Sequence, residues 1–334
     1  MTVLLTGGAG YIGSHVAVEM INAGFNVVIA DNLSAGHKDV PERIKTVTGV
    51  SFPFFEIDIC DKEAVRGIFD SFSVDAVVHA AGYKAVAESV SLPLKYYRNN
   101  TDGALTLLEV MAERGVKAFV FSSSATVYGI PDTVPIKETA HTGDCLNAYG
   151  RTKYIIEKIL EDLCRSDPLF SAVPLRYFNP VGAHRSGLLG DDPIGVPNNL
   201  MPYILRVAAG RLPELNIFGN DYPTKDGTCI RDYIHVVDLA KGHTAAVDYA
   251  VKHSGYEVFN LGTGIGYSVL DMVRVFEKVT GRPLPYKFAP RREGDSAEYL
   301  ADPSKAEKNL GWRAVLTIED MCFDAQRYEG GKEQ

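Results

Sequence analysis

The stretch Thr2-Val3-Leu4-Leu5-Thr6-Gly7-Gly8-Ala9-Gly10-Tyr11-Ile12-Gly13 opens the chain with a short apolar run that passes directly into glycines. From residue 12 to residue 23 the apolar residues recur at helical spacing. The predicted order is therefore strand, tight turn and helix. Gly7, Gly10 and Gly13 let the backbone turn sharply, approach a pyrophosphate and pack helix on strand, and free N–H groups at the helix start attract phosphate. The stretch predicts a dinucleotide-binding unit.

A second predicted strand supports this interpretation. It covers residues 26–30 and ends in Asp31. An acidic residue at about this distance from the glycine turn accepts hydrogen bonds from the adenosine ribose hydroxyls and repels a 2′-phosphate. Asp31 therefore favours NAD over NADP. The alternative, a glycine turn followed by a solvated aspartate, explains fewer of the coinciding features.

Strand and helix patterns alternate through the first half of the chain. Strands are predicted at 52–57, 76–79 and 118–122, and helices at 63–69 and 94–113. Such alternation predicts an α/β fold with a Rossmann-type doubly wound parallel sheet. Ligands of these sheets bind beyond the carboxyl ends of the strands. We therefore expect the cofactor to lie against Asp58, Ala80-Ala81-Gly82 and Ser122-Ser123-Ser124.

Two polar residues of this half keep more than one interpretation. Asp58 either contacts adenine or caps the next helix. His79 ends a strand with a buried pattern, and a histidine in that position is more often a core residue than a ligand.

The regular alternation weakens after Arg176, where Pro, Gly and Asn accumulate at 180–202 and 218–228. This composition predicts a smaller, loop-rich α/β substrate domain. The ranges 230–251 and 257–261 have helix and strand patterns that we expect to rejoin the main sheet. The predicted domains are then discontinuous. Residues 1–176 and 230–261 form the NAD-binding domain, and residues 177–229 and 262–334 form the substrate domain.

The composition is that of a soluble globular protein, with 334 residues, 46% apolar residues and 23% charged residues. No apolar run approaches the ~20 residues that span a bilayer. The five cysteines are scattered without Cys-x-x-Cys spacing, and the net charge is −8. We therefore expect a cytoplasmic protein with reduced thiols, no metal site, no membrane partner and no nucleic-acid partner.

A helix predicted after Asn147 carries a Tyr-x-x-x-Lys pair, Tyr149 and Lys153. Asn147 is a favourable N-cap residue, and residues four apart share a helix face. An ammonium group beside a phenol favours the phenolate and lowers the tyrosine pKa, so the pair is chemically suited to act as a general base. The spacing alone is weak evidence. Two further pairs share it, Tyr154 with Lys158 and Tyr328 with Lys332.

Longer motifs carry a resemblance that covers nearly the whole chain. Besides the glycine stretch, they are Ser-Ser-Ser-Ala-Thr-Val-Tyr-Gly at 122–129, Tyr-Gly-Arg-Thr-Lys at 149–153, Arg-Tyr-Phe-Asn-Pro-Val-Gly-Ala-His at 176–184, Pro-Asn-Asn-Leu-Met-Pro at 197–202, Phe-Gly-Asn-Asp-Tyr-Pro-Thr at 218–224, Arg-Asp-Tyr-Ile-His at 231–235 and Ala-Pro-Arg-Arg-Glu-Gly-Asp at 289–295. Together they resemble the extended short-chain dehydrogenase/reductase superfamily and, within it, the UDP-glucose 4-epimerase family. The later motifs are far more specific than the glycine turn.

The resemblance implies interconversion of UDP-galactose and UDP-glucose by NAD-dependent oxidation at C4, rotation of the 4-keto sugar and return of the hydride to the opposite face. It implies a catalytic group in which Tyr149 takes the proton of the 4-hydroxyl, Ser124 holds that oxygen and Lys153 keeps Tyr149 ionised. Sugar-nucleotide 4,6-dehydratases of the superfamily carry Thr-Asp-Glu where this chain has Ser-Ala-Thr at 124–126, so elimination of water is disfavoured. A homodimer through the helices at 94–113 and 149–164 is implied as well.

The cofactor-binding residues expected from the turn, the strand ends and the resemblance are Gly7, Gly10, Tyr11, Ile12, Gly13, Asp31, Asn32, Asp58, Ile59, Ala80, Ala81, Lys84, Asn99, Ser122, Tyr149, Lys153, Tyr177 and Phe178. The substrate-binding residues implied by the resemblance are Ser124, Tyr149, Asn179, Asn199, Leu200, Arg231, Arg292, Asp295 and Tyr299. At Ala80 and Tyr83 the chain departs from the family pattern, so the strength of cofactor binding stays open.

In the family that the chain resembles, members restricted to glucose and galactose carry a bulky residue at the position of Tyr299. A small residue at that position accompanies acceptance of N-acetylated sugars. Three alternatives stay open from the sequence. They are an epimerase that also accepts UDP-N-acetylglucosamine and UDP-N-acetylgalactosamine, a net NAD-dependent sugar-nucleotide oxidoreductase, and a non-catalytic nucleotide-sensing or scaffold protein.

Overall fold

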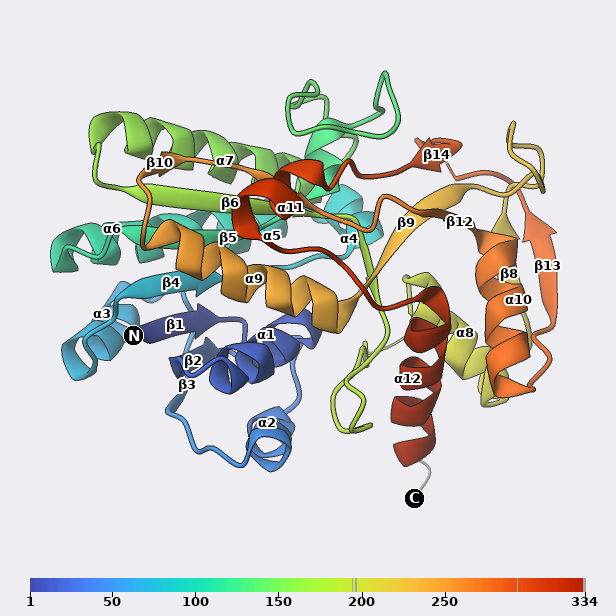
Figure 1. Ribbon diagram of the computed structural model, residues 1–334, viewed down its shortest axis with the longest axis horizontal. Helices are drawn as coiled ribbons and strands as arrows, with labels where there is room; N and C mark the ends of the chain where they lie inside the picture. Colours follow the sequence, from blue (N-terminus) through green and yellow to red (C-terminus); the bar gives the residue numbers. More distant parts are fainter. Residues whose placement is uncertain (194, 196, 293, 333–334) are drawn as a thin grey trace.

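A computed structural model describes residues 1–193, 195, 197–292 and 294–332. Glu293 of the motif at 289–295 and the last two residues of the predicted substrate domain lie outside this description. Figure 1 shows two lobes side by side, a larger one built around a long sheet and a smaller one that contains the C-terminal helix.

The larger lobe is organised by an eight-stranded parallel sheet. Its order is β10-β6-β5-β4-β1-β2-β3, with β11 also paired to β6. The strands are β1 (Thr2–Thr6), β2 (Asn26–Asp31), β3 (Phe54–Glu56), β4 (Ala76–His79), β5 (Ala118–Ser124), β6 (Ser171–Tyr177), β10 (Gly255–Tyr256) and β11 (Phe259–Leu261). The order reverses between β1 and β4, which is where doubly wound sheets bind ligands. The predicted fold class is confirmed.

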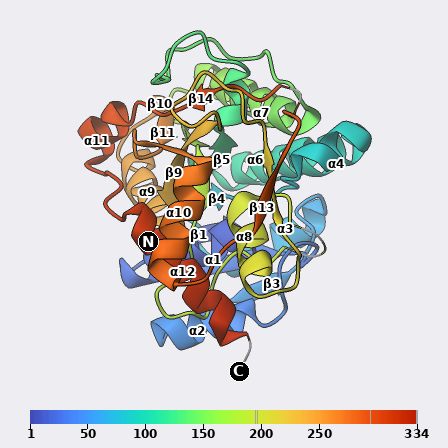
Figure 2. The ribbon, with the colours of Figure 1, turned by 90° about the vertical axis from the view of Figure 1, so that its right-hand side faces the viewer.

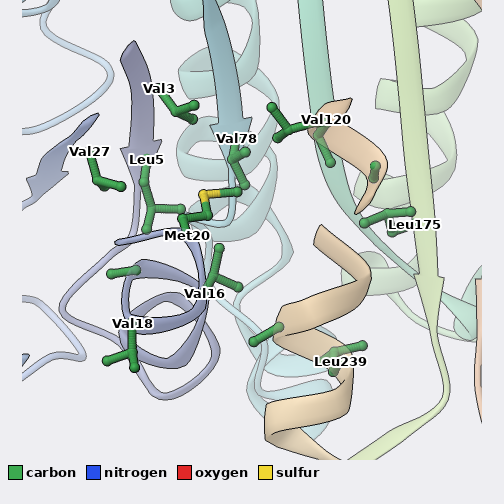
Figure 3. Close-up of a cluster of buried hydrophobic side chains, with 14 of the residues drawn as sticks. Val3, Leu5, Val16, Val18, Met20, Val27, Val78, Val120, Leu175 and Leu239 are labelled. Carbon is green, nitrogen blue, oxygen red and sulfur yellow. The ribbon is translucent and has the colours of Figure 1, made fainter. Parts of the chain in front are cut away.

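Helices cover both faces of this sheet (Figures 1 and 2). One face carries α1 (Tyr11–Asn22), α2 (Val40–Thr48) and α9 (Val236–Ala250), and the other carries α3 (Lys62–Ser71), α6 (Gly103–Arg114) and α7 (Ala148–Ser166). The alternation of β1 side chains explains the two layers. Val3 and Leu5 pack with Val16 and Leu239 (Figure 3), whereas Leu4 joins the core on the opposite face. Burial on both faces is typical of a parallel sheet.

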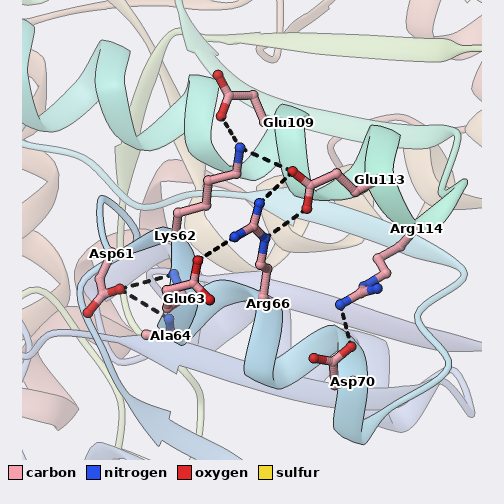
Figure 4. Close-up of polar contacts among 9 residues, drawn as sticks. All are labelled: Asp61, Lys62, Glu63, Ala64, Arg66, Asp70, Glu109, Glu113 and Arg114. Atoms are coloured by element: carbon pink, nitrogen blue, oxygen red, sulfur yellow. Dashed lines mark hydrogen bonds and ion pairs between the residues drawn. The ribbon is translucent and has the colours of Figure 1, made fainter.

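Ion pairs on the outer surface join α3 to α6 (Figure 4). Lys62 lies 3.1 Å from Glu113, and Arg66 donates to the same carboxylate at 2.8 Å. Because these groups face solvent, their contribution to stability is small, and the packing beneath them holds the layer.

The smaller lobe has two sheets of its own. One contains β7 (Asn179–Val181), β9 (Ile230–His235), β12 (Gly266–Ser268) and β14 (Glu298–Tyr299), and the other pairs β8 (Leu215–Phe218) with β13 (Tyr286–Ala289). Its core is formed with α8 (Leu200–Ala208), α10 (Val269–Thr280) and α12 (Ile318–Gly331). The remaining short elements are α4 (Val86–Ser91), α5 (Pro93–Tyr96), η1 (Tyr97–Asp102), η2 (Ala125–Tyr128) and α11 (Ser304–Leu310).

The structure corrects the prediction of one α-helix at 94–113. The π-helical segment η1 separates α5 from α6. Within it Asn100 is buried, and its amide nitrogen donates to Tyr83 O and to Thr152 Oγ1, both at 3.1 Å. These inward contacts to other elements accompany the widened turns, which in helices are frequent near functional sites.

The range 230–251 is also corrected, because its first six residues form a strand rather than the start of the helix. β9 runs beside β7, β12 and β14, and its last four residues are buried. This six-residue stretch mixes apolar and charged side chains, and it is too short for its periodicity to separate a strand from the start of a helix. The helix itself begins at Val236. As expected, β11 rejoins the main sheet beside β6.

Candidate active site

The glycine turn between β1 and α1 is closely packed. Gly7 has a φ of +75°, and a Cβ there would lie 2.6 Å from Ala81 N. A Cβ on Gly13 would lie 2.0 Å from Gly7 O. Both positions therefore require glycine. The turn brings the start of α1 against the segment that follows β4, at the reversal of strand order.

Asp31 lies at the end of β2 and contacts this turn. Its Oδ2 accepts from Ala9 N at 2.9 Å, and its Oδ1 accepts from Leu33 N at 2.8 Å. Burial raises the pKa of the carboxyl, and the two backbone donors oppose that shift. Asp31 thus helps to hold the turn in place, a role the sequence did not indicate, and its carboxylate also retains lone pairs for a ribose.

Three other predicted cofactor-binding residues differ in exposure. Asp58 is exposed and accepts only from Cys60 N, whereas the cap of α3 is Asp61. The capping alternative for Asp58 is therefore wrong. The Ile59 side chain is in the core, so only its backbone is available to a ligand. Lys84 crosses to the smaller lobe, where its Nζ lies 3.6 Å from Asp191.

Tyr149 and Lys153 lie on the inward face of α7, which begins with the Asn147 side chain accepting from Gly150 N at 2.8 Å. Lys153 is 5% exposed. Its Nζ donates to Ser122 O at 2.6 Å and lies 5.8 Å from the centroid of the Tyr149 ring. The expected N-cap is confirmed, and the helix holds the ammonium group beside the phenol.

The electrostatics of this pair differ from the prediction in one respect. Burial raises the pKa of Tyr149, and the Ser124 side chain opposes that shift. Burial lowers the pKa of Lys153 to about 7. The ammonium group is directed to the Ser122 carbonyl, so desolvation outweighs its effect on the phenol. The predicted lowering of the Tyr149 pKa by Lys153 is not seen in this arrangement.

Ser124 ends β5 and begins the 3₁₀ turn η2. Its Oγ accepts from Thr126 N at 3.2 Å and from Thr126 Oγ1 at 3.0 Å. A Cβ on Gly150 would lie 3.1 Å from Thr126 Oγ1, which explains glycine at this point of α7. The strand end and the start of α7 are therefore in close contact.

The chain then passes from the main sheet to the smaller lobe. Tyr177 ends β6 and is hydrogen-bonded to His243, Phe178 is buried, and Asn179 begins β7. Phe178 also lies against Tyr299, with 5.8 Å between the ring centroids. The Tyr299 hydroxyl donates to Ala125 O at 2.6 Å. Tyr299 is therefore fixed next to Ser124.

The remaining predicted substrate residues lie on the smaller lobe in separate groups. Arg231 donates to Asp295 at 3.2 Å, and β14 places Tyr299 opposite Arg231 in register. Asn199 stands immediately before α8 with Leu200 as its first residue, and its amide nitrogen donates to Asp191 at 3.4 Å. A small cavity joins this second group to the glycine turn. Its lining includes Tyr11, Gly182, Asp191 and Asn199.

Sequence reasoning missed two residues of this region, Phe218 and Asp191, which contact predicted substrate- or cofactor-binding residues. The Arg292 guanidinium lies 4.2 Å from the Phe218 ring centroid, a stacking surface with a positive charge. Asp191 contacts both Lys84 and Asn199. Phe218 stood within a quoted motif, so that motif was the available signal, whereas Asp191 had none.

No cluster of metal-binding side chains is found among the described residues, and none of their helices is long and apolar enough to cross a membrane. The five thiols are free. His79 is buried and shares a 2.8 Å hydrogen bond with Thr6, as expected of a core histidine.

A glycine turn at the switch point of a doubly wound sheet, together with a tyrosine and a buried lysine at the strand ends of the same sheet, defines a dinucleotide-dependent Rossmann-type protein. Residues 3–262 match the model of the NAD dependent epimerase/dehydratase family, and the chain belongs to this family. The curated relatives include UDP-glucose 4-epimerase of Bacillus subtilis (strain 168), 54% identical over 329 residues, with 98% of this chain and 97% of that protein covered. The Homo sapiens UDP-glucose 4-epimerase is 53% identical over 333 residues, with 98% and 96% covered.

Solved structures agree with these relatives. UDP-glucose 4-epimerase from Bifidobacterium longum in complex with NAD+ and UDP superposes with a TM-score of 0.96 at 49% identity, covering 100% of this chain and 99% of that one. UDP-glucose-4-epimerase from Stenotrophomonas maltophila with bound NAD and formylated UDP-arabinopyranose gives a TM-score of 0.97 at 46% identity, with the same coverage.

Proposed function

We propose that this protein is an NAD-dependent UDP-sugar 4-epimerase that interconverts UDP-galactose and UDP-glucose. The observation that carries the proposal is the pair of half-buried Tyr149 and buried Lys153 beside Ser124, at the carboxyl edge of the sheet. Relatives named UDP-glucose 4-epimerase, with about half of their aligned residues identical to those of this chain, support the same reaction.

The residues of the glycine turn fit NAD. Gly7 and Gly13 pack against neighbouring backbone where no Cβ would fit, which keeps the turn tight at the start of α1, where free N–H groups can receive a pyrophosphate. Asp31 offers a carboxylate, which accepts from ribose hydroxyls and repels a 2′-phosphate. We assign the dinucleotide to this turn and to the strand ends named above. When bound, NAD supplies the hydride acceptor and donor for C4 of the sugar.

The chain's own residues handle the proton and the orientation of the sugar. Tyr149 accepts the proton of the 4-hydroxyl and returns it, while Ser124 holds the same oxygen by a hydrogen bond. Accepting this proton requires the phenolate form of Tyr149, which a positive charge on Lys153, 5.8 Å from the ring centroid, would favour. Burial raises the pKa of Tyr149, so its phenolate, once formed, is a strong proton acceptor.

The substrate's UDP group is assigned to the smaller lobe. Arg231 and Arg292 provide permanently charged donors for the diphosphate, and the Phe218 ring under Arg292 provides an apolar surface for a base. Asn179 and Asn199 supply amide groups, Asp295 accepts from hydroxyls, and the backbone of Leu200 adds a donor at the start of α8.

Purified protein incubated with UDP-galactose tests the proposal. We expect UDP-glucose to form without added NAD, or with catalytic amounts only, and no NADH to accumulate. NADH in proportion to the sugar consumed would instead identify a net oxidoreductase. Binding of UDP-galactose without turnover would identify a nucleotide-sensing protein.

A broader substrate range is the second candidate, and Tyr299 bears on it. The hydrogen bond from Tyr299 to Ala125 O fixes a large ring next to Ser124, which favours restriction to glucose and galactose. Native protein and Tyr299→Cys should be compared on UDP-galactose and UDP-N-acetylgalactosamine. We expect the second substrate to gain rate in Tyr299→Cys. Equal rates on both substrates in native protein would exclude the restriction.

We further propose a cytoplasmic homodimer and the discontinuous domain division given by the sequence, except that residues 230–235 (β9) belong to the sheet of the smaller lobe. Apolar side chains exposed on α4 to α6 favour a second copy as partner on that face. They are Val90, Leu92, Leu94 and Leu105. The free thiols accord with a reducing compartment. Sedimentation of native protein and Leu94→Lys distinguishes dimer from monomer.

A further inference from the structure

A buried ion pair stands directly behind the site, one helical turn beyond Lys153. Tyr149, Lys153 and Glu157 follow one another at four-residue steps on α7, so they share its inward face. Glu157 is 2% exposed, and no role has been assigned to it above.

The carboxylate of Glu157 accepts hydrogen bonds from three strands of the main sheet, the longest from the Tyr256 hydroxyl on β10 at 3.4 Å. Arg176 on β6 donates to it twice, from Nε at 3.0 Å and from Nη2 at 2.7 Å. Ser123 on β5 donates its hydroxyl at 2.6 Å. Arg176 is 4% exposed and lies over the Tyr128 ring at 4.7 Å. A charge so fully enclosed is tolerated only when it is paired and hydrogen-bonded, as it is here.

These contacts converge on the strand end that forms the site. Ser123 stands between Ser122, whose carbonyl accepts from Lys153, and Ser124, which faces Tyr149. Lys153 and Glu157, on consecutive turns of α7, therefore form hydrogen bonds with Ser122 and Ser123, which are consecutive residues of β5. The distance between the phenol and Ser124 depends on this register.

Glu157 is also the anion that acts on Lys153. Burial lowers the pKa of Lys153 and the Glu157 carboxylate raises it. Of the other groups that face Lys153, His79 from β4 stays neutral because burial holds its pKa at about 3, and Tyr149 and Tyr177 are phenols of raised pKa. Arg176 is paired with the same carboxylate at 2.7 Å.

We propose that Glu157 is a positioning residue for the Tyr149–Lys153 pair, which fixes α7 against the ends of β5 and β6 and keeps the ammonium group of Lys153 charged. This inference rests on the proposed function, because it assumes that turnover requires protonated Lys153.

The test is the pH dependence of kcat for UDP-galactose epimerisation. In Glu157→Gln, Lys153 loses its proton more readily, so we expect the alkaline limb to move to lower pH by about half a unit or more. Glu157→Gln/Arg176→Gln removes both charges, which avoids an unpaired buried guanidinium, and the limb should move in the same direction. Ser123→Ala removes one hydrogen bond from the same carboxylate without removing its charge, so its limb should coincide with that of native protein.

Thermal unfolding of each variant separates stability from this effect. If both Glu157 variants are less stable than native protein but their alkaline limbs do not move, Glu157 is only a structural residue and the inference is wrong. If Glu157→Gln does not fold, the double variant decides the question alone. An inactive native protein would contradict the proposed function, and an active native protein with unmoved limbs would contradict only this inference.

Discussion

Two faces of α7 carry the same Tyr-x-x-x-Lys spacing in different surroundings. On the inward face, Lys153 lies 5.8 Å from the Tyr149 ring centroid, and on the other face Lys158 lies 5.4 Å from that of Tyr154. Lys153 is buried, whereas the Lys158 side chain is 51% exposed and pairs with Glu161 at 3.0 Å. The geometry within each pair is nearly equal. Enclosure by the sheet therefore distinguishes the proposed catalytic pair from a solvated one.

Replacement of the two tyrosines should give the largest difference. Tyr149→Phe should lower kcat by ~10²–10⁴, the usual contribution of a positioned acid–base group. Tyr154→Phe, the matched control, should stay within about twofold of native protein, because its phenol lies beside Gly143 and not beside Ser124. Steady-state rates on UDP-galactose, with UDP affinity measured in parallel, check both. Similar losses in the two variants would contradict the difference between the faces.

Replacement of the two lysines should separate activity from stability. Lys153 has a folded pKa of about 7, below its ordinary value of 10.5. The unfolded chain therefore binds more protons between these values, so the buried ammonium destabilises the fold near neutral pH and the penalty fades as pH rises toward 10.5. We expect Lys153→Met to lose most activity and to raise Tm at pH 7 by roughly 2 °C or more.

Lys158→Met is the control for this change. It removes only an exposed ion pair, so we expect activity near that of native protein and little change in Tm. A lower Tm for Lys153→Met at pH 7, or a difference from native protein that widens toward pH 10, would show that burial of this charge is not costly.

A buried and an exposed histidine should differ in their effect on stability at acid pH. Burial lowers the pKa of His79 from 6.5 to about 3, whereas His141 is exposed beside Asp144. Because the folded pKa lies below the unfolded one, the unfolded chain binds the extra proton, and stability falls as pH decreases from 6.5 toward 3. His79→Asn keeps a partner for Thr6 and should flatten this fall by at most ~1.4 kcal/mol per pH unit. Urea unfolding across this range measures it, and equal slopes in His79→Asn and His141→Asn would count against the account.

The smallest effects are expected from two helical glycines. A Cβ on Gly67 of α3 meets nothing within 4 Å, so Gly67→Ala should stabilise the protein by about 0.5–1 kcal/mol. In Gly150→Ala the new Cβ presses on Thr126 and hence on Ser124, so we expect a smaller gain and a roughly two- to fivefold loss of kcat. Equal gains in stability with unchanged kcat would show that the contact with Thr126 is unimportant.

The local part of this fold was predictable from the sequence. The strand, glycine turn and helix at the N-terminus and the N-cap at Asn147 rest on contacts between near neighbours in the chain, which composition and periodicity report directly. The preference for NAD was predictable as well, because Asp31 follows the glycine turn at the sequence distance expected of an acidic residue that binds the ribose.

The remainder depends on residues far apart in the chain. The π-helical segment contains Asn100, whose side chain bonds to Thr152, and β9 is a strand because other strands of the smaller lobe pair with it. The Glu157–Arg176 pair joins a helix to a strand, and neither residue has a sequence signal that names the other. Such contacts are set by tertiary packing, which outweighs local pattern.

One measurement tests the central claim most directly, that the inward face of α7 carries the proton chemistry of an epimerase. UDP-galactose labelled with deuterium at C4 is incubated with native protein, Tyr154→Phe and Tyr149→Phe. The account predicts UDP-glucose that retains deuterium at C4 from the first two proteins and almost no product from Tyr149→Phe. Product formed by Tyr149→Phe at the native rate, or product whose deuterium has been lost to water, would contradict it.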